Sequence, residues 1–195
     1  MTDRKNNAVG IFCGVTLVAA FIYGLVLPFM WGNDPLSETG TLSLLCEDRK
    51  VFFWLWGILT SAAVIFNSKY LYKKYEYKNR FFDSLFVMAF LSMCGIALSL
   101  DHSIADWNPK RIIHWIATGL FIAFIFAPVF LFFAVNIKRH KNFTIYTAVM
   151  VLILMSFVVI FVFVGKSALM EMVPIALVEI FLAVMNILPK KVLSP

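Results

Sequence analysis

Six long runs of apolar residues, separated by short polar segments, organise the chain. Most runs have the length that an α-helix needs to cross a hydrocarbon core of about 30 Å. Each should be helical, because a backbone polar group left unpaired in lipid costs several kcal/mol, and the alternating pattern of a membrane barrel is absent. The runs predict helices over about residues 8–30, 51–68, 81–100, 112–137, 143–165 and 169–188. The sequence therefore predicts one all-α domain over residues 1–195, a polytopic membrane bundle of six transmembrane helices.

Composition supports a membrane protein. Hydrophobic residues make up 62% of the chain and charged residues only 14%, more apolar side chains than a water-soluble fold of this size could bury. The first run follows Arg4 and Lys5, but it is longer than the apolar region of a signal peptide, and no small-x-small cleavage site precedes Trp31. We therefore expect it to be retained as the first helix.

The distribution of basic residues predicts the orientation of the bundle. Lys and Arg concentrate near both ends of the chain, in residues 68–80 and in residues 138–141. The opposite loops are richer in acidic residues, namely Asp34, Glu38, Glu47, Asp48, Asp101 and Asp106. The positive-inside rule then places both termini in the cytoplasm, an N-in/C-in topology. Attraction to anionic lipid accounts for the scattered basic residues, so nucleic acid is not expected as a partner.

Polar residues inside the apolar runs are the first candidates for function, because they are expensive in a membrane. Glu179 lies roughly 7–15 Å below the outer surface at 1.5 Å per residue, and Asn186 follows seven residues later on nearly the same helical face. His114 lies about one turn inside the fourth helix, just after Arg111. One hypothesis is that His114, Glu179 and Arg111 form a single polar site. The alternative is that Glu179 makes a structural hydrogen bond between helices.

A metal site has weaker support in the sequence. Carboxylates and imidazoles of the outer loops are suitable zinc ligands, and Asp101, His102 and His114 are the candidates. However, no His-x-x-x-His or His-Glu-x-x-His spacing occurs, and serine-nucleophile and phosphate-binding glycine motifs are absent. We therefore predict no catalytic residue, no metal and no cofactor.

One segment carries a resemblance to a known family. The stretch Pro35-Leu36-Ser37-Glu38-Thr39-Gly40-Thr41 resembles the P-x-I-S-D-T-G-T signature of the damage-regulated autophagy modulator (DRAM) family. His114 and Glu179 are similar to a histidine and a glutamate that members carry in helices four and six. Glu38 stands where the family usually has Asp, and Ile180 where it usually has Trp after the glutamate.

The resemblance implies a six-helix membrane protein that modulates autophagy, lysosomes or membrane lipids, in the lysosome, another endomembrane or the plasma membrane. The wider group includes proteins linked to GPI-lipid remodelling. In the signature, Gly40 permits a tight turn, while Ser37, Thr39 and Thr41 can satisfy backbone groups where the first helix ends. Glu38 would then face the polar site or lipid headgroups.

Three functions remain open from the sequence. The first is a non-enzymatic protein that binds or organises membrane lipids, with a groove reaching Glu179 and His114. The second is an accessory subunit of a larger channel, transporter or receptor complex, which predicts a compact bundle without an open cavity. The third is an intramembrane lipid hydrolase or acyltransferase, which needs at least three of Glu38, Asp101, His102, His114 and Glu179 to converge.

Overall fold

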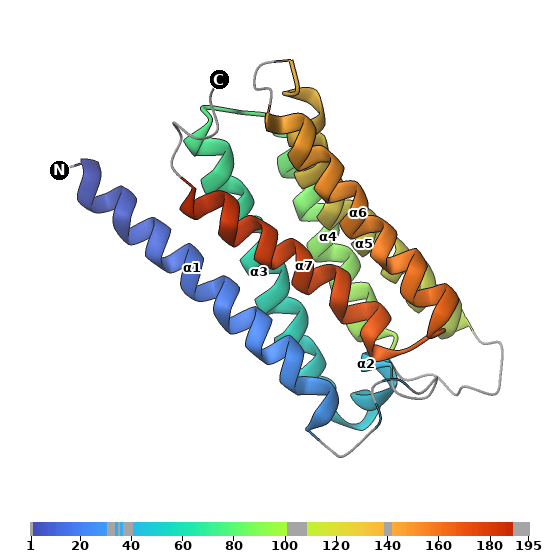
Figure 1. Cartoon of the computed structure of the whole chain (residues 1–195). Helices are drawn as coiled ribbons and strands as arrows, with labels where there is room; N and C mark the ends of the chain where they lie inside the picture. The colour runs from blue at the N-terminus through green and yellow to red at the C-terminus, as the bar shows by residue number, and fades with distance from the viewer. Residues whose placement is uncertain are drawn as a thin grey trace.

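The chain folds into long helices joined by short connections (Figure 1). The computed structural model describes residues 2–30, 34, 36, 41–100, 109–138 and 142–188, without the side chains of residues 2–8 and 47. The elements are α1 (Thr2–Val26), η1 (Leu27–Phe29), α2 (Leu42–Leu45), η2 (Glu47–Arg49), α3 (Lys50–Lys74), α4 (Arg80–Leu98), α5 (Pro109–Val135), α6 (Asn142–Phe163) and α7 (Ala168–Ile187). Within these ranges there is no strand, as the sequence predicted.

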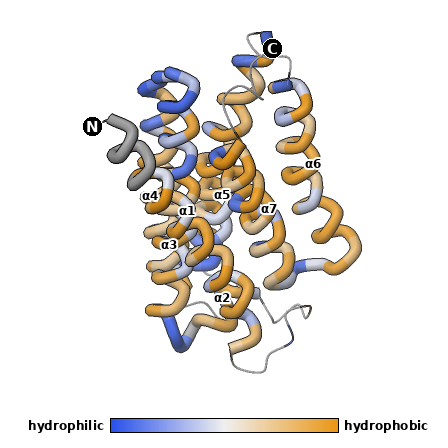
Figure 2. Tube along the Cα trace, turned by 60° about the vertical axis from the view of Figure 1, so that its left-hand side comes forward, coloured by the Kyte–Doolittle hydropathy of each residue, from blue (hydrophilic) through white to orange (hydrophobic). Residues whose placement is uncertain are grey.

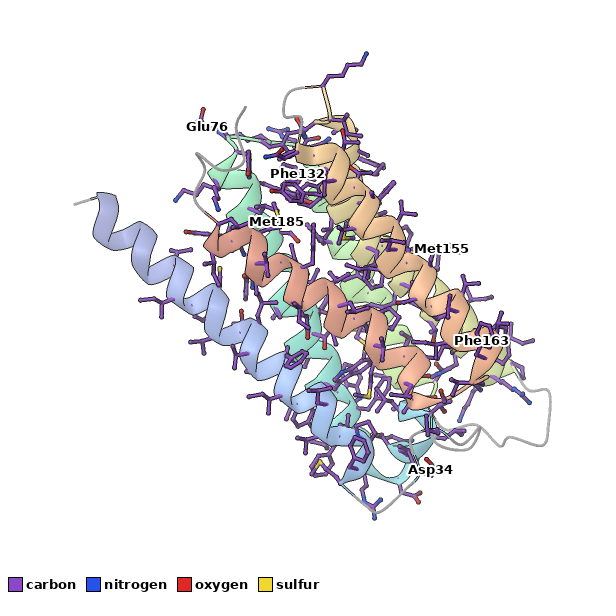
Figure 3. All side chains as sticks on the ribbon, in the orientation of Figure 1. Asp34, Glu76, Phe132, Met155, Phe163 and Met185 are labelled. Carbon is purple, nitrogen blue, oxygen red and sulfur yellow. The ribbon has the colours of Figure 1, made fainter. Side chains whose placement is uncertain are left out.

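Six of the helices, α1 and α3 to α7, are long and apolar enough to span a membrane. Many of their large hydrophobic side chains are exposed, and the trace is hydrophobic along most of each helix (Figure 2). On α6, for example, Met155 and Phe163 point away from the bundle (Figure 3). Such a surface fits contact with lipid, because a water-soluble monomer rarely exposes apolar patches of this extent. The predicted integral membrane protein with an all-α bundle of six spans is therefore confirmed.

Helix α3, the second of the six spans, lies at the centre of the bundle. α3 contacts α1, α4, α5 and α7, while α6 packs on α5 and α7 at one flank. α1 begins and α7 ends at one end of the bundle, which we call the terminal end, and α2 lies at the other, the α2 end (Figure 1). This arrangement fits an even number of crossings. The assignment of the terminal end to the cytoplasm stays a prediction.

The helix ends differ from the prediction mainly in α1 and α3. α1 begins at Thr2, six residues before the predicted start at residue 8. α3 continues to Lys74, six residues beyond the predicted end at residue 68. The extra turns are rich in Lys and Tyr, so the apolar run alone did not include them. Tyr75 ends the helix and Glu76 adopts a positive φ of 55°, the left-handed conformation that often follows a helix C-terminus. The short helix α2 was not predicted, because four residues give no periodic signal.

Aromatic side chains fill the terminal end of the bundle. Tyr72 is buried, its ring lies 4.8 Å from that of Phe132, and its hydroxyl donates to the Pro128 carbonyl at 2.8 Å. Rings of α3 to α7 and of the α3–α4 connection join this cluster: Tyr72, Tyr75, Tyr77, Phe82, Phe86, Phe132, Phe133, Phe143, Tyr146 and Phe181. Tyr72 is therefore a core residue.

Polar side chains tie three helices together near the same end. Asn67 of α3 is fully buried, and its amide donates to the Cys13 carbonyl of α1 at 2.9 Å. The Asn186 amide of α7 donates to Asn67 Oδ1 at 2.7 Å. Lys74 Nζ donates to carbonyls at the end of α7, including that of Met185 at 2.9 Å. Asn186, expected in a polar site with Glu179, therefore forms part of an interhelical tie at the terminal end.

Candidate functional site

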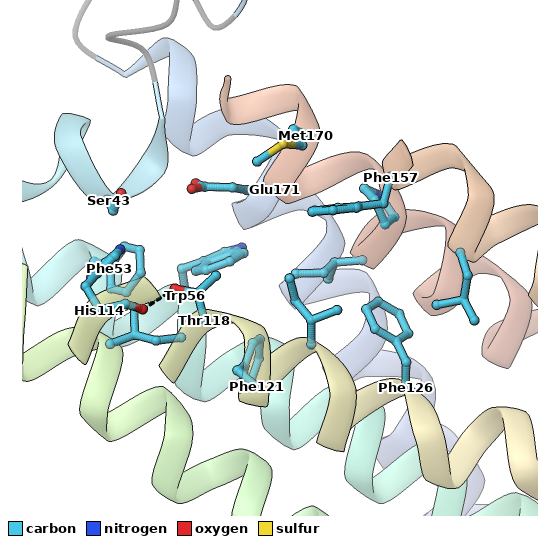
Figure 4. A pocket seen from close by; sticks show the side chains of 15 residues that line it. Ser43, Phe53, Trp56, His114, Thr118, Phe121, Phe126, Phe157, Met170 and Glu171 are labelled. Carbon is cyan, nitrogen blue, oxygen red and sulfur yellow. Dashed lines mark hydrogen bonds between the residues drawn. The ribbon is translucent and has the colours of Figure 1, made fainter. Parts of the chain in front are cut away.

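An apolar cavity lies between α3, α5, α6 and α7 toward the α2 end (Figure 4). It contains about 710 Å³ of space not occupied by atoms, counting its open part. Most of its lining is aromatic or aliphatic: Phe53, Trp56, Ile96, Phe121, Ile122, Phe126, Leu154, Phe157, Met170, Pro174 and Ile175. The polar lining consists of Ser43, His114, Thr118 and Glu171. Apolar walls with a few polar groups are typical of sites for small apolar ligands.

The packing of α6 explains why the cavity exists. The buried residues of this helix are Phe143 and Met150, in the half nearer the terminal end, and Ile153 at its middle. In the other half, Leu154 and Phe157 line the cavity and are only half-buried. This half of α6 therefore covers the cavity without filling it.

The cavity is elongated along α5. Its lining runs from His114 to Phe126 on this helix. Those twelve residues correspond to about 18 Å at 1.5 Å per residue, a little over half of a hydrocarbon core of about 30 Å. The polar lining residues come from the α2 end of their helices, so the cavity has one polar end and one apolar end (Figure 4).

Glu171, in the first turn of α7, is a lining residue that the sequence analysis missed. Its Oε2 accepts a hydrogen bond from the Leu42 backbone N–H at 2.8 Å, at the start of α2. Thr41, the residue before α2, makes no capping bond with its own side chain, and its hydroxyl lies 3.3 Å from that of Ser43. A carboxyl group distant in sequence therefore satisfies a donor that a local side chain usually binds. The sequence did contain a signal for Glu171, because this acidic residue stands among the apolar residues Leu169, Met170 and Met172.

His114 lies at the same end of the cavity and is buried. Its Nδ1 lies 3.4 Å from the hydroxyl of Ser99, which follows α4 directly, and its carbonyl accepts from the Thr118 hydroxyl at 2.8 Å (Figure 4). The ring is thus held between α4 and α5 with one edge at the cavity. A histidine held in this way can bind a polar group of a ligand through a ring nitrogen, as donor or as acceptor.

His114 and Glu179, which the sequence analysis placed in one hypothetical polar site, do not line the same cavity. His114 shares its cavity with Glu171, whereas Glu179 lines a separate crevice against α1. Glu179 lies eight residues after Glu171, about 12 Å further along α7 at 1.5 Å per residue. Arg111 does not line the cavity, and its guanidinium lies 5.8 Å from the centre of the Trp115 ring. The sequence identified an intramembrane carboxyl group but not its depth relative to His114.

The outer-loop candidates fall mostly outside the described residues. Glu38, Asp101 and His102, and the signature positions Ser37, Thr39 and Gly40, are in this class. Of the signature, Thr41 is described and precedes α2. Among the described residues, no three His, Cys, Asp or Glu side chains are grouped so that they could hold a metal ion.

The cysteine at the end of α2 has a perturbed pKa because this end of the bundle is closely packed. Cys46, at the end of this helix, is fully buried. Burial and, to a smaller extent, the neighbouring Glu171 carboxyl raise the pKa of its thiol to about 12, although Arg49 opposes the shift. The thiol therefore stays protonated at neutral pH.

Comparisons with known proteins found no matching family model, no matching curated protein and no matching solved structure. The resemblance to the DRAM family therefore stays a prediction from the sequence.

Proposed function

We propose that this chain is a non-enzymatic membrane protein that binds a membrane lipid in the cavity between α3, α5, α6 and α7. The observation that carries the proposal is the form of the cavity, which has apolar walls, one polar end and one apolar end. A lipid tail would lie along Phe121 and Phe126, and a polar group of the lipid would lie near His114 and Glu171. Through this binding the protein would organise lipids and so modulate membranes, including those of autophagy and lysosomes.

The physical argument rests on matching chemistry and length. Lipid tails gain little by leaving the bilayer for another apolar environment, so affinity must come from packing and from the polar end. The aromatic walls provide the packing, and His114, Ser43 and Thr118 provide hydrogen-bonding groups. The cavity length of about 18 Å corresponds to roughly one leaflet of a core of about 30 Å. In the predicted N-in/C-in orientation this is the outer or lumenal leaflet.

The other two functions have less support. An accessory subunit was expected to be a compact bundle without an open cavity, and the cavity beside α6 favours the lipid-binding proposal instead. A hydrolase or acyltransferase needs converging acidic and histidine side chains. In the described part of the chain His114 and Glu179 line separate spaces.

Native mass spectrometry of the protein, released from its own membrane in lipid discs, tests the proposal. Ile122→Trp places a large side chain in the lining of the cavity. Ala123→Trp adds the same side chain at the next position, which is exposed and does not line the cavity. We expect a retained lipid with the wild type and with Ala123→Trp, and at least about tenfold less with Ile122→Trp, a change of about 1.4 kcal/mol.

Absence of a retained lipid from the wild type, or equal retention by both tryptophan variants, would contradict the proposal. A protein partner at fixed stoichiometry without lipid would favour the accessory subunit. A bound zinc ion would favour the hydrolase.

A further inference from the structure

A second space in the bundle contains a buried carboxyl group. Glu179 of α7 is 3% exposed, and its Oε1 has no hydrogen-bond partner among the described residues. It lines a crevice bounded by Ala20, Phe21, Gly24 and Leu25 of α1, Trp56 of α3, and Met172, Ile175 and Ala176 of α7. A polar group left unpaired in a membrane is costly, so this oxygen marks a position where a hydrogen-bond donor would be stabilised.

The same crevice also offers a hydrogen-bond donor. A Cβ atom built on Gly24 would lie 3.4 Å from Trp56 Nε1, so the indole nitrogen faces the side of α1 that lines the crevice. The indole N–H can only donate, and a carboxyl oxygen can accept whether the group is ionised or protonated. A group that both donates and accepts would therefore satisfy Glu179 and Trp56 together. A hydroxyl is such a group.

The size and position of the crevice restrict the ligand. It contains about 210 Å³ of unoccupied space, counting its open part, which is less than a third of the cavity beside α6. Phe21 and Leu25 at its border are half-buried and exposed, respectively, so the crevice adjoins the lipid-facing side of α1. Because the residues at this border are apolar, a charged headgroup would lose hydration there without a compensating charge. A small neutral headgroup on a lipid that stays in the bilayer would fit.

From this geometry we infer that the crevice between α1, α3 and α7 binds the hydroxyl group of a neutral membrane lipid. The lipid hydroxyl donates to Glu179 and accepts from the Trp56 indole, while the body of the lipid lies against α1 in the bilayer. This site is separate from the cavity of the proposed function, although Trp56 and Ile175 contribute to both.

Photolabelling in reconstituted vesicles tests this inference on the full chain. The probes are a photoreactive sterol, a photoreactive diacylglycerol and, without a free hydroxyl, a photoreactive phosphatidylcholine. The two hydroxyl probes distinguish a sterol from a glyceride as the source of the group. We expect at least one of them to label the α1 segment around Phe21 and Leu25, and phosphatidylcholine to label it about tenfold less.

Two further controls isolate the hydrogen bond. The methyl ether of the labelling probe cannot donate a hydrogen bond to Glu179. It should therefore label the wild-type protein much less than the probe with the free hydroxyl. Glu179→Leu removes the acceptor and should lose labelling, whereas Glu179→Gln keeps an acceptor oxygen and should retain most of it. Equal labelling by the methyl ether, or by Glu179→Leu, would overturn the inference.

The two sites can also fail separately. Ile122 lines only the cavity beside α6, so the Ile122→Trp variant should be labelled at α1 as strongly as the wild type. If Ile122→Trp removed the labelling at α1 as well, the hydroxyl probe would be occupying the other cavity, and the inference would be wrong.

Discussion

A close approach of α3 and α4 leads to a quantitative prediction about Gly57. A Cβ atom built on Gly57 would lie 2.6 Å from Met93 Sδ and 2.9 Å from Met93 Cγ. Met93 is only 1% exposed, so its side chain has little space to move away. Gly57→Ala should therefore incur an overpacking cost of about 1–3 kcal/mol, partly offset by about 1 kcal/mol of better helix propensity. The net expectation is a loss of roughly 0–2 kcal/mol in the free energy of unfolding.

Gly119→Ala is the matched control for this substitution. Gly119 lies within α5, and a Cβ atom built there meets nothing within 4 Å. The gain in helix propensity applies to both variants, so Gly57→Ala should be less stable than Gly119→Ala by about 1–3 kcal/mol. The assay is SDS titration in mixed micelles, followed by fluorescence of the five tryptophans.

A double-mutant cycle then assigns the effect to its cause. Met93→Ala removes the colliding atoms, at a cost of its own of about 2–5 kcal/mol. In that background Gly57→Ala should lose its overpacking cost, a coupling of about 1–3 kcal/mol. Equal stability of the two alanine variants, together with no coupling to Met93, would refute the close approach of α3 and α4 at this point.

Three other predictions concern individual side chains. The Cys46 thiol, whose pKa is raised to about 12 by burial and a neighbouring carboxyl group, should resist iodoacetamide at about pH 8 until SDS unfolds the protein. The ordinary pKa of a thiol is 9.0, and the folded protein raises it for Cys46. The contribution of the buried thiol to the free energy of unfolding should therefore be complete below about pH 9 and decline as the pH rises toward 12. Asn67→Ala should lower the free energy of unfolding in the same titration by about 1–2 kcal/mol, because it removes bonds between α1, α3 and α7; no change would contradict that tie. Asn142-Phe143-Thr144 matches a glycosylation sequon and should stay unglycosylated if the terminal end is cytoplasmic. Pro35→Thr completes a second sequon at Asn33 and should produce a glycosylated band on a gel.

The sequence predicted the fold well because each span is an apolar run of sufficient length. It was less accurate where polar residues continue a helix. α3 extends through Tyr70, Tyr72 and Lys74, and the tertiary contacts of Tyr72 and Lys74 stabilise these last turns. Such contacts come from α5 and α7, distant in sequence, and hydropathy cannot report them. The orientation of the bundle depends on charge bias alone and stays a prediction.

The candidate site was predicted only in part. The sequence analysis singled out His114, which is buried and lines the cavity, but it overlooked Glu171 in favour of Glu179. The sequence placed both glutamates on the last helix, yet their depths relative to α5 depend on where each helix begins. A shift of two turns separates a residue that lines the cavity from one that faces α1. The cavity itself depends on how loosely the second half of α6 packs, which no local pattern encodes.

The most direct test of the lipid-binding account is to locate a lipid tail inside the bundle. Crystals grown in a lipid mesophase with a phospholipid that carries bromine on its tail would give an anomalous signal from that tail. The account predicts a bromine peak in the cavity between α5 and α6, beside Phe121 and Phe126. Peaks confined to the outer faces of α1 and α6, with the cavity closed by rearranged side chains, would contradict it.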